Sequence, residues 1–214
     1  MPAVTGWKVE ALGDRAVLVT CRDELSAQQL AAAVKEKQWP GVLDLVVAYH
    51  SLAVHVDTTL LPVSKLLQQL GRVKLKNIES VGKLHLIPCC YEMGEDLEMV
   101  AQELGMSKEE VITQHSETMF TIYAIGFSPG FPYLGWLPKT LQGIARRTEP
   151  RLKVPAGSVA IVGKQSCVYP QPTPGGWALI GRTPMKLVDL QTSYFPMAVG
   201  DQVKFERIEP WTVE

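Results

Sequence analysis

The sequence lacks the features that mark membrane proteins, secreted proteins and disulfide-stabilised proteins. Its 214 residues contain no apolar run of about 18 residues, so we expect no transmembrane helix. The opening MPAVTGWKVEALGD has no basic stretch followed by an apolar one, so we expect no signal peptide. The four cysteines form no Cys-x-x-Cys pair, and the adjacent Cys89 and Cys90 are poorly arranged for a structural disulfide. Free thiols are typical of a reducing cytosol, so we predict a cytoplasmic protein.

Metal-ligand motifs and an excess of charge are missing as well. The four histidines are scattered and form no H-x-x-x-H motif, so we predict no metal site. The net charge is −1, which argues against nucleic acid as a partner. With 46% hydrophobic and 20% charged residues, the composition is that of an ordered globular protein.

Apolar periodicity predicts an α+β protein whose first domain spans residues 1–80. The expected order of elements is ββαββα, with strands at 7–12 and 15–20, a helix over 26–38, strands at 42–49 and 51–57, and a helix over 62–70. Ser26 and Gln29 have the spacing of a capping box at the start of the first helix. The periodicity lapses over residues 76–83, and we place the domain boundary there.

The second domain is expected over residues 81–214 and is rich in strands. A strand at 83–88 is followed by two helices, over 97–104 and 107–115, and Ser107 with Glu110 forms a second capping box. Six further short strands are expected at 119–126, 158–163, 166–170, 177–181, 186–189 and 202–208. Short strands separated by turn residues favour a closed or sandwiched β-domain.

Glycine and proline concentrate between Gly126 and Pro184, where 18 of the 32 in the chain fall within 59 residues. A flexible linker would be rich in serine and poor in aromatic residues, whereas this segment carries several rings. Proline restricts the chain and glycine allows positive φ, so together they favour rigid loops. We therefore predict an ordered binding surface, with a partner-binding aromatic group of Phe127, Phe131, Tyr133, Trp136 and Trp177.

The same segment is strongly basic. Its Lys and Arg outnumber its single acid, Glu149, to give a charge of +6, so the rest of the chain carries −7. A local positive field favours an anionic ligand or an acidic partner, and the planar guanidinium group of arginine matches carboxylate geometry. The alternative is a solvated basic surface with no ligand.

Two catalytic motifs are matched only superficially. Gly126-Phe-Ser128-Pro129-Gly130 has the spacing of a hydrolase nucleophile elbow, but Pro129 lacks the N–H that such an oxyanion hole uses, and all four histidines precede the serine. The segment from Gly157 to Lys164 is one residue too long for a phosphate-binding loop, and its interior Val-Ala-Ile-Val is typical of a strand.

Three segments in fixed order resemble one family: GFSPGFPYLGWLP (126–138), PRLKVPAGSVAIVG (150–163) and PTPGGWALIGRTP (172–184). Further similarity extends over 12–19, 50–57, 87–101 and 112–127. The chain resembles, over nearly its whole length, the family of 5-oxoprolinase B subunits, also called kinase A inhibitor-like, allophanate hydrolase subunit 1 or carboxyltransferase-domain subunit 1. It departs from the family at the vicinal cysteines and at Gly143–Arg146, where a proline more often precedes the paired arginines.

This resemblance implies a small N-terminal α+β domain and a C-terminal cyclophilin-like β-barrel. It implies the B component of an enzyme that opens 5-oxo-L-proline to L-glutamate at the expense of ATP, together with A and C components. ATP is then expected at the level of the complex and not clearly on this chain. Two alternatives remain open within the family: inhibition of a sporulation-type histidine kinase, and a partner role in a biotin-dependent carboxyltransferase.

For an anionic lactam substrate, the basic segment supplies the candidate site residues. We expect Arg147, Arg151 and Lys153 to contact the anion, with Arg151 and His115 as the candidate catalytic residues. Hydroxyl or backbone donors are expected from Ser128, Gly130, Gly157 and Ser158. The alternatives are turn geometry for the glycines, strand initiation for Ser158, surface solubility for the cations and a structural role for His115.

Overall fold

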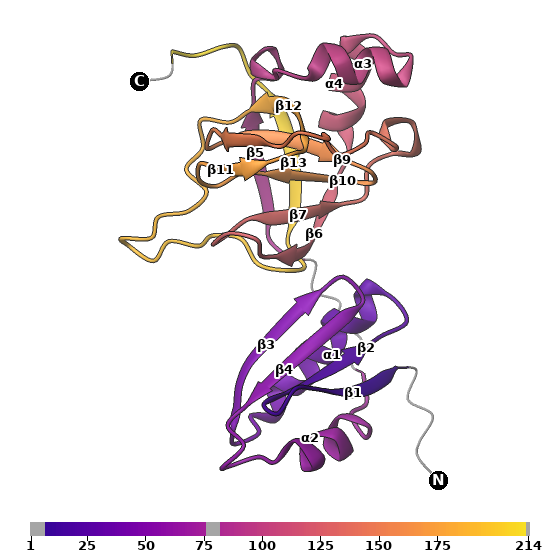
Figure 1. The fold of residues 1–214 in the computed structure, drawn as a ribbon, viewed down its shortest axis with the longest axis vertical. Helices are drawn as coiled ribbons and strands as arrows, with labels where there is room; N and C mark the ends of the chain where they lie inside the picture. The colour runs from indigo at the N-terminus through magenta and orange to yellow at the C-terminus, as the bar shows by residue number, and fades with distance from the viewer. Residues whose placement is uncertain (1–6, 76–81, 213–214) are drawn as a thin grey trace. The chain divides into compact units, whose positions relative to one another are not determined.

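The computed structural model describes residues 7–75 and 82–212. The chain divides into two compact units, Met1–Ser80 and Val81–Glu214, and each is considered by itself (Figure 1). Both units combine antiparallel strands with a few helices, so the predicted α+β class is confirmed.

The described part of Met1–Ser80 contains one antiparallel sheet and two helices. Its elements are β1 (Lys8–Leu12), β2 (Ala16–Thr20), α1 (Glu24–Lys37), β3 (Val42–Ala48), β4 (Ser51–Val56) and α2 (Val63–Leu70). The strands lie in the order β1-β2-β4-β3, and all neighbours are antiparallel. Alternate residues of β4 are buried, because its apolar face packs under the helices while the other face is partly exposed.

The first helix begins earlier than its sequence pattern suggests. Asp23 is the N-cap residue, and its carboxylate accepts hydrogen bonds from the backbone N–H and the hydroxyl of Ser26. Ser26 therefore lies inside the first turn as a donor to the cap. The second predicted capping box is correct, since Ser107 and Glu110 exchange both hydrogen bonds at the start of α4 (Lys108–Glu117).

Within Val81–Glu214, residues 82–212 contain a curved sheet of seven strands. They are β5 (Leu84–Cys89), β6 (Phe120–Ile125), β7 (Pro132–Gly135), β9 (Ser158–Val162), β10 (Gln165–Val168), β12 (Ala178–Arg182) and β13 (Gln202–Arg207). The spatial order is β5-β13-β6-β7-β10-β9-β12, and β5 with β13 is its parallel pair. The ends of this series meet at an isolated bridge between Cys90 and Arg182, which closes the sheet around a core.

Shorter elements surround the curved sheet. They are α3 (Leu97–Leu104), α4, the 3-10 turns η1 (Tyr91–Met93) and η2 (Lys139–Leu141), and a separate ribbon of β8 (Arg151–Val154) with β11 (Thr173–Gly175). The sheet is apolar on both faces where the ribbon lies. In β9, Val159 and Ile161 belong to the main core, whereas Ala160 belongs to a second cluster with Val154 of β8.

The second unit departs from the sequence prediction in its shortest strands. Residues 186–189 form no strand but a loop, because the Asp189 carboxylate accepts the backbone N–H groups of Gln191 and Thr192. In addition, the apolar pattern does not predict β7, β8 and β11, because they lie in the segment rich in glycine and proline. The cyclophilin-like description of this unit stays a prediction.

Gly157 is the point where three segments of the second unit cross. Its N–H donates to the Tyr169 carbonyl at 2.7 Å, and its carbonyl accepts the Thr183 N–H at 2.8 Å. Its φ is +81°, and a Cβ built there would lie 2.2 Å from the Thr183 carbonyl oxygen. The chain therefore requires glycine at this position for both conformation and space.

We predict that Gly157→Ala lowers the free energy of unfolding by about 3 kcal/mol, because the added methyl group clashes with fixed backbone. The matched control is Gly163→Ala, where φ is +57° but no atom lies within 4 Å of the added Cβ. The control should lose about 1 kcal/mol. Equal losses in urea-induced unfolding would contradict the role of the crossing.

Candidate functional site

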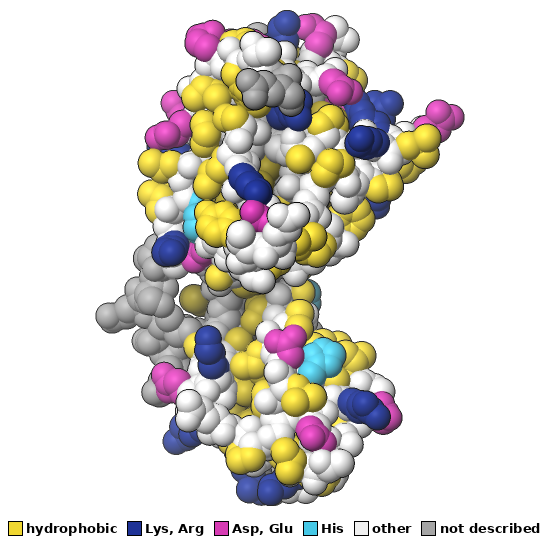
Figure 2. Space-filling view, turned by 90° about the vertical axis from the view of Figure 1, so that its left-hand side faces the viewer, with side chains coloured by type: hydrophobic (Ala, Val, Ile, Leu, Met, Phe, Trp, Pro, Cys, Tyr) yellow, Lys and Arg dark blue, Asp and Glu magenta, His cyan; other side chains and the backbone are white. Residues whose placement is uncertain are grey.

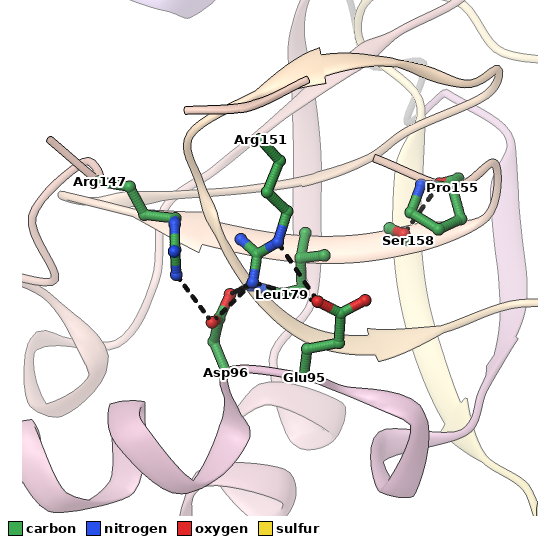
Figure 3. Close-up of polar contacts among 7 residues, drawn as sticks. All are labelled: Glu95, Asp96, Arg147, Arg151, Pro155, Ser158 and Leu179. Carbon is green, nitrogen blue, oxygen red and sulfur yellow. Dashed lines mark hydrogen bonds and ion pairs between the residues drawn. The ribbon is translucent and has the colours of Figure 1, made fainter. Parts of the chain in front are cut away.

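One buried carboxylate binds both arginines that the sequence analysis predicts as anion contacts. Asp96, just before α3, is buried, and Arg151 Nη2 lies 2.8 Å from its Oδ1 and 2.9 Å from its Oδ2. Arg147 Nη1 lies 3.3 Å from Oδ1. Figure 3 shows both guanidinium groups converging on this one side chain. We call Asp96, Arg147 and Arg151 the arginine clamp.

Backbone hydrogen bonds fix the clamp to three segments that are distant in sequence. Leu179 of β12 donates its N–H to Asp96 Oδ2 at 2.7 Å, and its carbonyl accepts the Asp96 N–H at 2.8 Å. The Arg147 N–H donates to the Gly176 carbonyl at 2.8 Å. The clamp therefore joins the start of α3, the start of β8 and β12.

The charge of Arg151 is secured by its neighbours. Burial alone would lower the pKa of Arg151, but hydrogen bonds and charges from Asp96 and Glu95 outweigh that effect and raise its pKa above the ordinary value. Glu95, which is largely exposed, lies 3.3 Å from Arg151 Nε. Two carboxylates from outside the basic segment thus offset part of its +6 charge.

One nitrogen of the clamp stays unsatisfied. Arg151 Nη1 is buried and has no hydrogen-bond partner among the described residues. An unpaired buried donor costs about 1–3 kcal/mol, so this nitrogen is a point of incomplete pairing within the clamp. Lys153 lies two residues further along β8 and is exposed, with no ion pair among residues 7–75 and 82–212.

His115 lies in the core and not at the surface. Its Nδ1 is 2.8 Å from the Tyr91 hydroxyl and its Nε2 is 2.9 Å from Ser166 Oγ. The ring packs against Phe120 and Phe205, with centroid separations of 5.1 and 4.6 Å. Burial lowers its pKa from 6.5 to about 3, so the imidazole is neutral. This placement favours the structural alternative over proton transfer to a substrate.

The expected hydroxyl and backbone donors are divided between different places. Ser158 Oγ donates to the Pro155 carbonyl at 2.8 Å, away from the clamp (Figure 3). The Gly157 N–H already donates a hydrogen bond to the Tyr169 carbonyl. Gly130 has a φ of +72° and packs against Val188, where a Cβ would lie 2.1 Å from Cγ2. The Ser128 hydroxyl is buried without a partner among the described residues.

The predicted aromatic surface separates into buried and exposed rings. Phe131 and Trp177 are buried, and Phe131 lies in edge-on contact with Tyr169 at a centroid separation of 5.1 Å. Tyr133 packs partly against this cluster. Phe127 and Trp136 are 63% and 41% exposed and can reach a partner. Elsewhere, hydrophobic side chains reach the surface among charges of both signs, as Figure 2 shows for one face.

The described residues contain no group of three or more His, Cys, Asp or Glu side chains arranged to hold a metal ion. Within the same residues, no helix combines the length and the apolar character needed to cross a membrane.

Comparison with known proteins decides the family. Residues 7–197 match the family described as carboxyltransferase domain, subdomain C and D. The chain belongs to this carboxyltransferase domain family. It is 36% identical to the B subunit of 5-oxoprolinase from Bacillus subtilis (strain 168) over 94% of this chain and 93% of that relative. It is 41% identical to the protein of the same name from Haemophilus influenzae over 77% of this chain and 78% of that relative. The predicted family resemblance is confirmed.

A solved structure of the protein TTHA0988 has the same fold. It is 36% identical over 89% of this chain, with a TM-score of 0.78. The matched region is 38% of the TTHA0988 chain, so the present chain spans well under half the length of that protein.

Sequence reasoning about this family member missed Asp96, the residue that organises the clamp. Glu95 and Asp96 directly precede a predicted helix, where acidic residues are common for reasons of the helix dipole alone. Their partners follow more than 50 residues later. The +6 charge of the basic segment was the available signal, since buried or half-buried arginines require carboxylates from elsewhere.

We predict that Asp96→Ala lowers the free energy of unfolding by about 3–5 kcal/mol, because it leaves two guanidinium groups and the Leu179 N–H without their acceptor. Glu95→Ala is the matched control, since it removes an adjacent but exposed carboxylate, and it should cost less than about 1 kcal/mol. Similar losses for both variants in chemical denaturation would contradict the buried role of Asp96.

We predict that His115 makes stability depend on pH. The folded-state pKa of about 3 lies below the unfolded value of 6.5, so its contribution is complete above pH 6.5 and is lost as the pH falls toward 3. The slope approaches about 1.4 kcal/mol per pH unit within this window. His115→Gln removes the titration. The difference in unfolding free energy between wild type and variant should therefore shrink from pH 6.5 to pH 4, and a constant difference would contradict the assignment.

Proposed function

We propose that this chain is a subunit of a 5-oxoprolinase, which opens 5-oxo-L-proline to L-glutamate at the expense of ATP together with subunits of types A and C. The observation that carries this proposal is the similarity to the 5-oxoprolinase B subunit of Bacillus subtilis, which extends over 94% of this chain and 93% of that protein. Because the similarity extends over both units, it favours the same role for the whole of this chain and that protein, and not the sharing of a single domain.

The arginine clamp gives the proposal a physical site. The substrate carries a carboxylate, and phosphoryl transfer from ATP would add negative charge to the lactam oxygen. Arg151 stays cationic, its orientation is fixed by Asp96, and its Nη1 lacks an acceptor among the described residues. Fixed cations of this kind stabilise developing charge without reorganisation. Arg147 and the exposed Lys153 extend the positive field at the start of β8.

The remaining parts of the reaction are assigned to the complex. The segment from Gly157 to Lys164 forms strand β9 and a turn, which is not a cradle for phosphates, so we place ATP on a partner subunit or between subunits. Exposed Phe127 and Trp136 supply apolar surface for such a partner.

A reconstituted assay tests the function. This chain, combined with candidate A-type and C-type subunits, is expected to release glutamate from 5-oxo-L-proline in an ATP-dependent manner, and omission of this chain should abolish the release. Absence of glutamate from the complete, soluble set would refute the proposal.

We predict that Arg147→Ala reduces kcat/KM in this assay about tenfold or more, because a cation that contacts an anionic substrate or transition state contributes about 1.4 kcal/mol or more. Arg147 is half-exposed, so the variant is expected to fold. Lys164→Ala removes an exposed cation from the turn between β9 and β10 and serves as the charge-matched control. Equal activities of the two variants would show that Arg147 is not part of the site.

A further inference from the structure

A cavity of about 390 Å³ opens on Val81–Glu214 at the Arg182 end of β12. Its volume lies within the range of small-molecule sites. The wall is mostly apolar, with Pro170, Met185, Val188 and Trp211 among the lining residues, and Arg182 adds a guanidinium group. None of these five residues belongs to the arginine clamp. We call this space the Arg182 cavity.

The Arg182 cavity is where the segments rich in glycine and proline converge. Residues 156–157, 170 and 182–185 all line it. Its lining includes the backbone crossing at Gly157, which is held by the hydrogen bonds to Tyr169 and Thr183. Gly130 packs directly on Val188, so the loop 126–130 supports one wall. Rigid loops that meet around a concave surface favour a preformed site.

Arg182 is fixed but not neutralised. Its backbone exchanges two hydrogen bonds with Cys90, at 2.8 and 2.9 Å, and its Nε donates to the Ala156 carbonyl at 3.1 Å. It has no acidic partner among residues 7–75 and 82–212. Lys186 also lines the cavity, but its charge is paired with Asp189 at 2.6 Å. With Nε engaged, the two Nη groups remain as a planar pair of donors, which matches the two oxygens of a carboxylate.

We propose that the Arg182 cavity binds a small carboxylate that carries a compact apolar ring. The carboxylate pairs with the Arg182 guanidinium group, and the ring packs against Trp211, Met185 and Val188. One unpaired guanidinium group matches a single negative charge, and the apolar wall stabilises the ring by removing it from water. This site is separate from the clamp, and its assignment does not depend on the proposed function.

Binding to the isolated full-length chain tests the inference with a matched pair of probes. Cyclopentanecarboxylate has the proposed charge and shape, and cyclopentanecarboxamide has the same ring without the charge. In calorimetric or ligand-observed NMR titrations, the carboxylate should bind at least about tenfold more tightly than the amide. Equal binding of the two probes, or no saturable binding of the carboxylate, would overturn the proposal.

Two variants locate the binding. Arg182→Gln should weaken carboxylate binding about tenfold or more and abolish the preference over the amide, while Lys164→Ala, which removes an exposed cation outside the cavity, should leave both unchanged. Trp211 lines the cavity beyond the end of the last strand, so Trp211→Ala keeps the test valid if Arg182→Gln unfolds. It should weaken both probes several-fold. Unchanged binding in either folded variant would place the ligand elsewhere.

Discussion

The buried carboxylate of Asp96 is the interaction on which the second unit depends. Removing a carboxylate from water costs several kcal/mol, and only complete pairing offsets that cost. Asp96 achieves it with two guanidinium groups and the Leu179 N–H. Because these partners come from the start of β8 and from β12, the carboxylate determines where the ribbon of β8 and β11 lies. A single side chain thus fixes the orientation of Arg151, which the proposed chemistry requires.

Backbone hydrogen bonds also hold the loops around the clamp. Gly157 exchanges hydrogen bonds with Tyr169 and Thr183, and the close approach leaves no space for a Cβ. At the same end of the β9 and β12 pair, the Cys90–Arg182 bridge closes the sheet. Proline and glycine are frequent in this region because each crossing needs either a restricted φ or a missing side chain. The density of these residues is therefore a signature of rigidity.

The sequence predicts the elements that have local signals. It does not predict the elements that are stabilised by partners distant in sequence. The helix caps and the alternating strand 51–56 follow from neighbours within four residues. The first cap is Asp23 and not the predicted Ser26, because both residue types suit that position. The short β7, β8 and β11 are stabilised by pairing with distant strands, so no local period reveals them. The arginines of the candidate site could be selected from charge alone, but Asp96 could not, since acids before a helix are common.

A residue type that is common in binding sites is not always available for chemistry in this fold. His115, Phe131 and Trp177 belong to residue types that dominate binding sites, yet all three are buried, and His115 has both nitrogens engaged by Tyr91 and Ser166. Burial that lowers the pKa of a histidine to about 3 removes the proton that acid–base chemistry near neutral pH would use. Available chemistry lies instead with donors that are fixed yet incompletely paired. Among the described residues, the Arg182 guanidinium group meets that condition at a cavity, and Arg151 Nη1 is fixed and unpaired but buried. Their rigidity means that an incoming anion loses its own freedom without also having to order the side chain that receives it.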